Sequence, residues 1–180
     1  EAAGNTIAAG SQRGLVIIRA SASKPVHGLL SIRGRASDLD PPVWRVAQMA
    51  ENPISKYQPW LRGELGLAVG QPTPISLTWQ VKNQESLFRG MPLALQVELT
   101  RRDGVQGDVR LRLTTTQVMP RKKVKQNKKD VMVDDVDRAL RLEGTPTLAG
   151  DASQAEVQVL VPTDLASRDW GLTLVAELLS

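Results

Sequence analysis

The chain has 180 residues, of which 41% are hydrophobic and 23% are charged, and its formal net charge is +4. That length suits one domain or two small ones with an ordinary apolar core, while the absence of cysteine excludes disulfide frameworks, thiolate metal sites and thiol nucleophiles. No apolar run approaches the ~18 residues of a transmembrane helix, so no membrane span is expected.

The first third of the chain begins with two β-type segments. Gly14–Ser21 and Gly28–Ala36 are short apolar-rich runs bounded by turn residues, and both are predicted strands. Ser37–Trp60 then carries four prolines and little strand periodicity, which predicts a linker. Within it, Val43–Glu51 is compatible with a short helix.

From residue 61 onward, apolar residues recur at every second position in a series of short segments. This alternation is typical of antiparallel strands with one face covered by a second sheet. Because no amphipathic helix interrupts the series, we expect an all-β, antiparallel sandwich. The predicted strands are Leu61–Gly70, Thr73–Asn83, Pro92–Arg102, Asp108–Thr116, Arg138–Gly144, Gln154–Asp164 and Asp169–Ser180.

The two ends of the chain resemble each other. Thr6–Ala36 and Thr147–Leu179 both run from Thr-aliphatic-Ala through a turn, a strand and a proline-containing connection to a Gly-Leu strand start. If the second segment closes one sandwich, the first closes a preceding one, and a chain without an initiator Met is then expected to be a fragment of a tandem array. The expected parts are the C-terminal strands of a preceding sandwich (1–36), a linker (37–60) and a sandwich (61–180) with a long charged loop (117–137).

The middle of the chain resembles a known repeat. The sequence LALQVELTRRDGVQGDVRLRL (Leu93–Leu113) is similar to bacterial immunoglobulin-like sandwich repeats, in which an apolar-alternating strand ends near Thr-Arg-Arg before a glycine turn. Gly63–Leu77 is similar to the strand that opens such a repeat. The resemblance implies tandem immunoglobulin-like sandwiches in a large exported bacterial protein, of the kind found near pre-peptidase C-terminal domains and subtilisin-like proteases. It brings no catalytic residues with it.

Candidate catalytic chemistry is sparse. His27 is the single histidine, no Gly-x-Ser-x-Gly elbow is present, and no glycine-rich phosphate loop follows a strand. We therefore expect no enzyme activity and no cofactor. Asp130, Asp134, Asp135 and Asp137 supply oxygen ligands of the kind that Ca²⁺ takes, but their spacing does not fit an EF-hand. Pairing of these carboxylates with nearby lysines is the competing interpretation, and no metal site is assigned.

The charged stretch, residues 117–137, holds the basic residues that give the whole chain its positive excess. Its six basic residues account for +6, so all other residues, including the four aspartates that follow, sum to −2 against a total of +4. A nucleic-acid-binding protein usually has a distributed basic surface and stacking aromatics, and Met119–Arg141 contains no aromatic residue. Specific nucleic-acid binding is therefore not expected. The candidate partner-contact residues are Arg121, Lys122, Lys123, Lys125, Lys128 and Lys129.

Three functions follow as hypotheses. The first is a non-catalytic segment of a larger exported protein that spaces or docks neighbouring domains of the same polypeptide. The second is a binding module whose basic residues 121–129 contact an anionic polymer or an acidic protein surface. The third is an accessory region of a subtilisin-like protease whose catalytic domain lies outside this chain.

Overall fold

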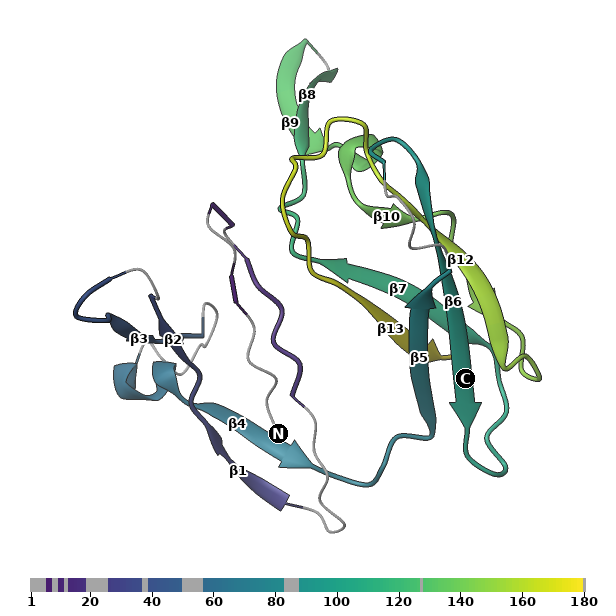
Figure 1. The fold of residues 1–180 in the computed structure, drawn as a ribbon, viewed down its shortest axis with the longest axis horizontal. Coiled ribbons are helices and arrows are strands. Elements are labelled where there is room, and N and C mark those ends of the chain that lie inside the picture. The colour runs from purple at the N-terminus through teal and green to yellow at the C-terminus, as the bar shows by residue number, and fades with distance from the viewer. Residues whose placement is uncertain are drawn as a thin grey trace. The chain divides into compact units, whose positions relative to one another are not determined.

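The structure is a computed structural model, and it confirms the all-β prediction. It describes residues 6–7, 10–11, 13–18, 26–36, 39–49, 57–82, 88–126 and 128–179, and these contain antiparallel strands and short 3₁₀ helices but no α-helix. The chain forms two compact units (Figure 1). The small unit comprises Arg19–Pro72 with Glu1, and the large unit comprises Ala2–Ile18 and Thr73–Ser180. No helix in the described part is long and apolar enough to cross a membrane.

The small unit contains two separate two-stranded sheets. Strand β1 (Val26–Leu30) pairs with β4 (Leu65–Val69), and β2 (Arg33–Arg35) pairs with β3 (Trp44–Val46). A 3₁₀ helix, η2 (Pro59–Gly63), precedes β4. None of the described residues of this unit is fully buried. Two-stranded sheets bury little surface, so the described residues of this unit form no packed core like that of the large unit.

Four local predictions over residues 14–60 need correction. The helix expected across Val43–Glu51 is wrong over its described residues, because β3 pairs with β2 and the backbone N–H of Ala36 extends the pairing to the carbonyl of Val43 at 3.0 Å. The predicted linker 37–60 therefore contains a strand. The strand predicted across Gly28–Ala36 is interrupted at Ser31 and Ile32. No regular strand spans Gly14–Ile18, and the rest of that predicted strand lies outside the described residues.

Two antiparallel sheets form the body of the large unit, apart from a two-stranded hairpin described below. The four-stranded sheet has the order β10-β12-β6-β5, and the three-stranded sheet has the order β11-β7-β13. The strands of the first are β5 (Ile75–Val81), β6 (Pro92–Arg101), β10 (Arg141–Leu142) and β12 (Gln154–Leu160). Those of the second are β7 (Val109–Thr115), β11 (Thr147–Leu148) and β13 (Leu172–Leu178).

One apolar core joins these two sheets. In β6, Leu93, Leu95, Val97 and Leu99 are buried at every second position, as the alternation predicts. Val109 and Leu111 of β7 and Leu174 of β13 belong to the same cluster from the other sheet. Leu and Val dominate because the chain has few aromatic residues. The large unit is thus β-sandwich-like.

The charged stretch is a β-hairpin. Strand β8 (Arg121–Gln126) pairs with β9 (Lys129–Asp134), and a 3₁₀ helix, η3 (Val136–Arg138), follows. The prediction of a long loop over 117–137 is therefore wrong for most of its length. Figure 1 shows the hairpin projecting beyond the two sheets of the large unit. The physical reason is cross-strand pairing of its basic and acidic halves, described below.

The two compact units divide the chain differently from the expected ranges 1–36, 37–60 and 61–180. The large unit begins its continuous part at Thr73 and also includes Ala2–Ile18. A tandem relation between two sandwiches stays a prediction.

Candidate functional site

The hairpin places opposite charges across from each other on one of its faces. In the antiparallel register, Arg121 lies opposite Asp134 and Lys125 lies opposite Asp130. The Arg121 Nε lies 3.3 Å from Asp134 Oδ1, with both side chains more than half exposed. Directly opposed residues of opposite charge stabilise an antiparallel pair modestly. The sequence order of a basic half followed by an acidic half therefore favours closure of the chain on itself.

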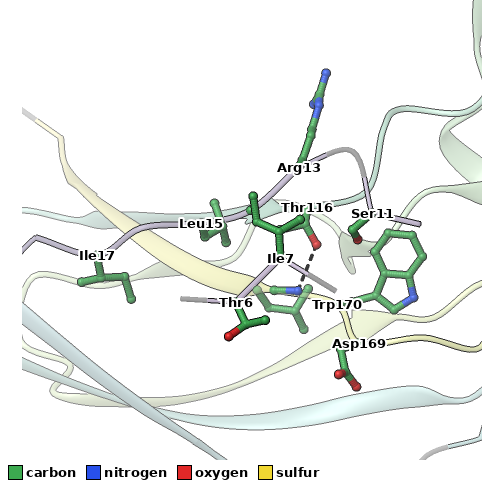
Figure 2. Close-up of a pocket in the computed structure, with 12 residues that line it drawn as sticks. Thr6, Ile7, Ser11, Arg13, Leu15, Ile17, Thr116, Asp169 and Trp170 are labelled. Carbon is green, nitrogen blue, oxygen red and sulfur yellow. Dashed lines mark hydrogen bonds between the residues drawn. The ribbon is translucent and has the colours of Figure 1, made fainter. Parts of the chain in front are cut away.

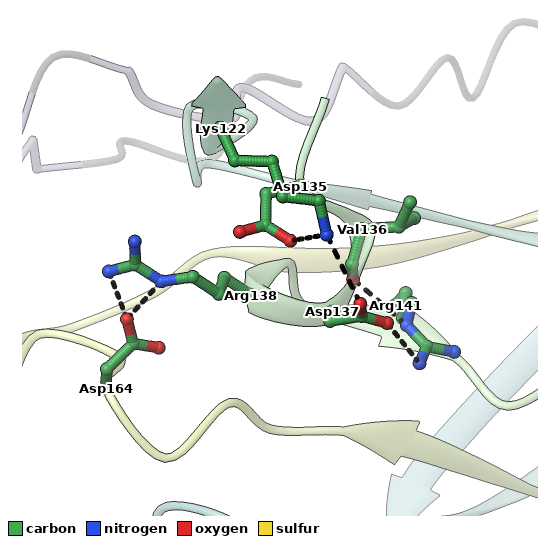
Figure 3. Close-up of polar contacts among 7 residues, drawn as sticks. All are labelled: Lys122, Asp135, Val136, Asp137, Arg138, Arg141 and Asp164. Atoms are coloured by element: carbon green, nitrogen blue, oxygen red, sulfur yellow. Dashed lines mark hydrogen bonds and ion pairs between the residues drawn. The ribbon is translucent and has the colours of Figure 1, made fainter. Parts of the chain in front are cut away.

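The base of the hairpin is held by a buried carboxylate. Asp135 follows β9, and its side chain is only 9% exposed. The Nζ of Lys122 lies 2.9 Å from Asp135 Oδ1 and 3.5 Å from Asp137 Oδ2 (Figure 3). The hydrogen bond from Lys122 to Asp135 raises the pKa of Lys122 above its ordinary value of 10.5. The backbone N–H of Asp135 also donates to the carbonyl of Pro120 at 2.7 Å.

A second set of contacts connects η3 to the rest of the large unit. Arg138 forms an ion pair and a hydrogen bond with Asp164, in the connection after β12 (Figure 3). That hydrogen bond raises the pKa of Arg138. Gln117 Nε2 donates to the carbonyl of Arg138 at 3.0 Å, while the Leu140 N–H donates to Gln117 Oε1 at 2.6 Å. Gln117 thus joins the residues before β8 to those that follow η3, and the Arg138–Asp164 pair joins η3 to the connection after β12.

The tip of the hairpin has a different character. Lys123, Lys125, Lys128 and Lys129 form no ion pair with any carboxylate in the described part of the chain. Two apolar side chains of β9, Val131 and Met132, are 38% and 47% exposed. Register places Met132 opposite Lys123. The tip thus presents cations and an apolar side chain on each face, with Lys123, Lys125 and Met132 on one and Lys129 and Val131 on the other. We call these five residues and Lys128 the tip surface.

The six predicted contact residues therefore divide into two groups. Arg121 and Lys122 are engaged by carboxylates of the hairpin and its base, whereas the four lysines of the tip surface are not. Sequence reasoning missed Gln117 and Asp164, which hold the base. Asp164 is 26 residues from Arg138, and no local pattern in the sequence relates the two.

The aspartates do not assemble a metal site among the described residues, where no group of three or more His, Cys, Asp or Glu side chains is placed to hold an ion. Asp134, Asp135 and Asp137 each lie within ion-pair distance of a basic side chain, whereas Asp130, opposite Lys125 in the register, forms no ion pair in the described part of the chain. The site's arrangement is that of a charge-paired stem with a cationic, partly apolar end.

Comparisons with known protein families, with curated proteins and with solved structures found no match to this chain. Its functional assignment therefore depends on the geometry described above.

Proposed function

We propose that this chain is a non-catalytic segment of a larger exported bacterial protein, in which immunoglobulin-like sandwich repeats space neighbouring domains and the tip surface docks one of them. The observation that carries the proposal is the contrast between the two ends of the hairpin. Its base is tied to the sandwich by Lys122–Asp135 and Arg138–Asp164, while its tip leaves cations and apolar side chains exposed.

A fixed base matters because ordering a contact surface costs conformational entropy at binding. A hairpin whose base is held by ion pairs and hydrogen bonds pays part of that cost on folding, so less is lost when a partner docks. Exposed Met132 and Val131 supply apolar area, and the surrounding lysines supply charge complementarity to an acidic surface.

The immunoglobulin-like part of the proposal is supported by the strand order of the large unit. Constant-type immunoglobulin sandwiches pack a four-stranded sheet on a three-stranded one. In the four-stranded sheet here, β6 lies between β5 and β12, and β10 is beyond β12. If β8, β9 and β11 are additions, this is the order of the first, second, fifth and fourth strands of that fold, and β7 and β13 are its third and sixth strands, with no seventh strand among the described residues.

Burial supports the non-catalytic part. Among described residues, the buried polar or charged ones are Thr116 and Asp135. The Thr116 hydroxyl accepts a hydrogen bond from the backbone N–H of Gly171 at 3.0 Å, and Asp135 is engaged by Lys122. Both polar groups thus serve contacts within the fold.

Cross-linking of the longer polypeptide tests docking. With an amine-reactive reagent and mass spectrometry, we expect Lys123, Lys125, Lys128 and Lys129 to link to a domain outside residues 1–180. Lys82 is the matched control, because it is exposed but paired with Glu156. Links from the tip surface that reach only neighbouring hairpin residues would contradict docking.

A second candidate function is the binding of an anionic polymer, and the four unengaged lysines of the tip favour it. Polyanion binding through these cations is expected to weaken steeply with salt. A chain in which Lys123, Lys125, Lys128 and Lys129 are all changed to Gln should elute from heparin at clearly lower salt than the unchanged chain.

The control for this experiment removes the same charge elsewhere. Changing Arg33, Arg35, Arg45 and Arg62 of the small unit to Gln lowers the net charge equally and leaves the hairpin intact. Equal shifts in elution for both variants indicate a general effect of charge and contradict a site at the tip.

A further inference from the structure

The last strand of the large unit has an open edge. In the described part of the chain, β13 pairs with β7 alone. The Thr116 N–H donates to the carbonyl of Gly171 at 3.0 Å, and the Leu179 N–H donates to the carbonyl of Asp108 at 2.8 Å. In an antiparallel ladder the bonded residues alternate. The odd-numbered residues of β13 therefore bond β7, and the backbone groups of Leu172, Leu174, Ala176 and Leu178 point to the open edge.

This edge lacks the features that usually prevent strand addition. Strand β13 has seven residues, with no proline, glycine or lysine among them. Its one charged residue, Glu177, is paired with Arg112 of β7 at 2.9 Å. A long, nearly uncharged edge is a template on which another strand can pair.

A candidate strand lies beside the start of β13. Leu15, Val16, Ile17 and Ile18 are four consecutive aliphatic residues, and the last three are 37–48% exposed. A β-carbon built on Gly171 would lie 3.4 Å from Leu15 Cδ1. Nearby, Arg168 Nη1 donates to the carbonyl of Gly10 at 2.7 Å. The N-terminal segment is thus already in contact with the residues that lead into β13.

A cavity separates the two segments beyond this contact. It has a volume of about 510 Å³, and Leu15, Ile17, Trp170 and Leu172 contribute to its lining (Figure 2). Apolar side chains, among them those of Leu15, Ile17 and Leu172, share the lining with polar ones such as Ser11 and Thr116, and closure of the cavity would bury the aliphatic part.

We propose that Gly14–Ile18 adds to the open edge of β13 as a further strand, and that this edge is a strand-acceptor site occupied by the chain's own N-terminal segment. Gly10 lies by Arg168 and Leu15 lies by Gly171, so both segments run in the same direction. The added strand is therefore parallel to β13. Main-chain hydrogen bonds provide the affinity in such additions, and alternate side chains provide the fit.

Disulfide trapping tests the proposal directly, because the chain contains no cysteine. Continuing the Leu15–Gly171 contact by two residues on each strand places Ile17 beside Thr173. The full chain carrying Ile17→Cys and Thr173→Cys is expected to form an intramolecular disulfide under mild oxidation. The control carries Ile17→Cys and Gln158→Cys, since Gln158 lies on β12 in the other sheet, and it should not cross-link.

Two outcomes of this experiment would overturn the proposal. Absence of a disulfide in the Ile17/Thr173 pair means that the segment does not continue along the edge. A disulfide-linked dimer means that a second copy of the chain occupies the site instead.

Hydrogen exchange gives a readout that does not depend on cysteine chemistry. An Ile17→Pro variant removes a backbone donor from the added strand without changing the buried core. Exchange of the Leu172 and Leu174 amides is expected to accelerate about tenfold or more in this variant, with no change at the Val97 amide of β6. Identical exchange at Leu172 and Leu174 in both proteins would show that the edge is not covered by this segment.

Discussion

The ammonium group of Lys122 lies 2.9 Å from the carboxylate of Asp135, which is almost entirely buried. Lys122 belongs to β8, and Asp135 begins the turn into η3, so this ion pair joins the outgoing and returning ends of the hairpin. It connects the exposed part of the charged stretch to the packed part of the sandwich.

Changing Lys122 to Met is expected to lower the free energy of unfolding at neutral pH, because the change leaves a buried carboxylate without its cation. Urea unfolding of the variant and the unchanged chain measures the difference. Lys123→Met is the matched control, since Lys123 has no ion-pair partner in the described part of the chain. Equal effects of the two changes would contradict the role of Asp135.

The same pair predicts a pH dependence. The pKa of Lys122 is raised in the folded chain, so its contribution is complete below the ordinary value of 10.5 and is lost as pH rises through the folded value. The difference in unfolding free energy between the unchanged chain and Lys122→Met should stay constant from neutral pH to about pH 9 and shrink above about pH 11. If this difference in unfolding free energy grew at alkaline pH, the predicted role of the Lys122–Asp135 pair would be wrong.

Arg101 connects β6 with the turn between β11 and β12 and with Gly107, whose carbonyl accepts a hydrogen bond from the Arg101 Nη2 at 3.4 Å. Its Nη2 donates to the carbonyl of Ala149 at 2.9 Å, and its Nη1 donates to the carbonyl of Ala152. Changing Arg101 to Met should destabilise the chain by about 1–3 kcal/mol, because partly buried carbonyls lose a charged donor. The stability of Arg101→Lys should lie between that of the unchanged chain and that of Arg101→Met, since an ammonium lacks the planar fork of a guanidinium. Chemical denaturation of all three proteins tests the order.

The turn of the charged hairpin has a strained position at Lys128, where φ is 64°. Glycine adopts this conformation without the steric cost that a side chain brings, and Asn-Gly is a favoured hairpin turn. Lys128→Gly is therefore expected to stabilise the hairpin by about 0.5–1 kcal/mol. Amide exchange across β8 measures the effect. Lys128→Ala removes the same charge without supplying the conformational freedom, so it should give no such gain.

The core of the large unit predicts a large effect at Leu95, which is fully buried in β6. Leu95→Ala should cost about 2–5 kcal/mol through lost apolar burial and the cavity left behind. Val175→Ala in β13 is the control, because Val175 is 46% exposed and such surface changes stay within about 0.5 kcal/mol. Thermal unfolding of both variants compares them, and similar melting temperatures would contradict the assignment of the core.

Much of the sandwich could be predicted from local pattern. The period of two in Leu93, Leu95, Val97 and Leu99 identifies one face of β6, and the structure buries that face. Asp103-Gly104 predicts a turn, and Gly104 has a φ of 80° there. These predictions hold because alternation and turn chemistry depend only on residues close in the chain.

The candidate site was harder to predict for the same physical reason. Six basic residues before four aspartates identify the segment and its charge. The local sequence does not show which residues pair across the segment, so it indicates a loop. The pairing that makes it a hairpin depends on register, which sets Arg121 opposite Asp134. Likewise, the prolines of 37–60 indicated a linker, while pairing with β2 makes Trp44–Val46 a strand.

The sequence by itself determined the all-β class, the apolar faces of the strands that build the core and the position of the positive excess, because these follow from composition and short-range periodicity. Only the tertiary structure decided which strands are neighbours, that Asp135 and Asp164 hold the hairpin base, and which lysines are left at its tip. Those outcomes depend on contacts between residues far apart in the chain, where the energy of each pairing is set by packing and register.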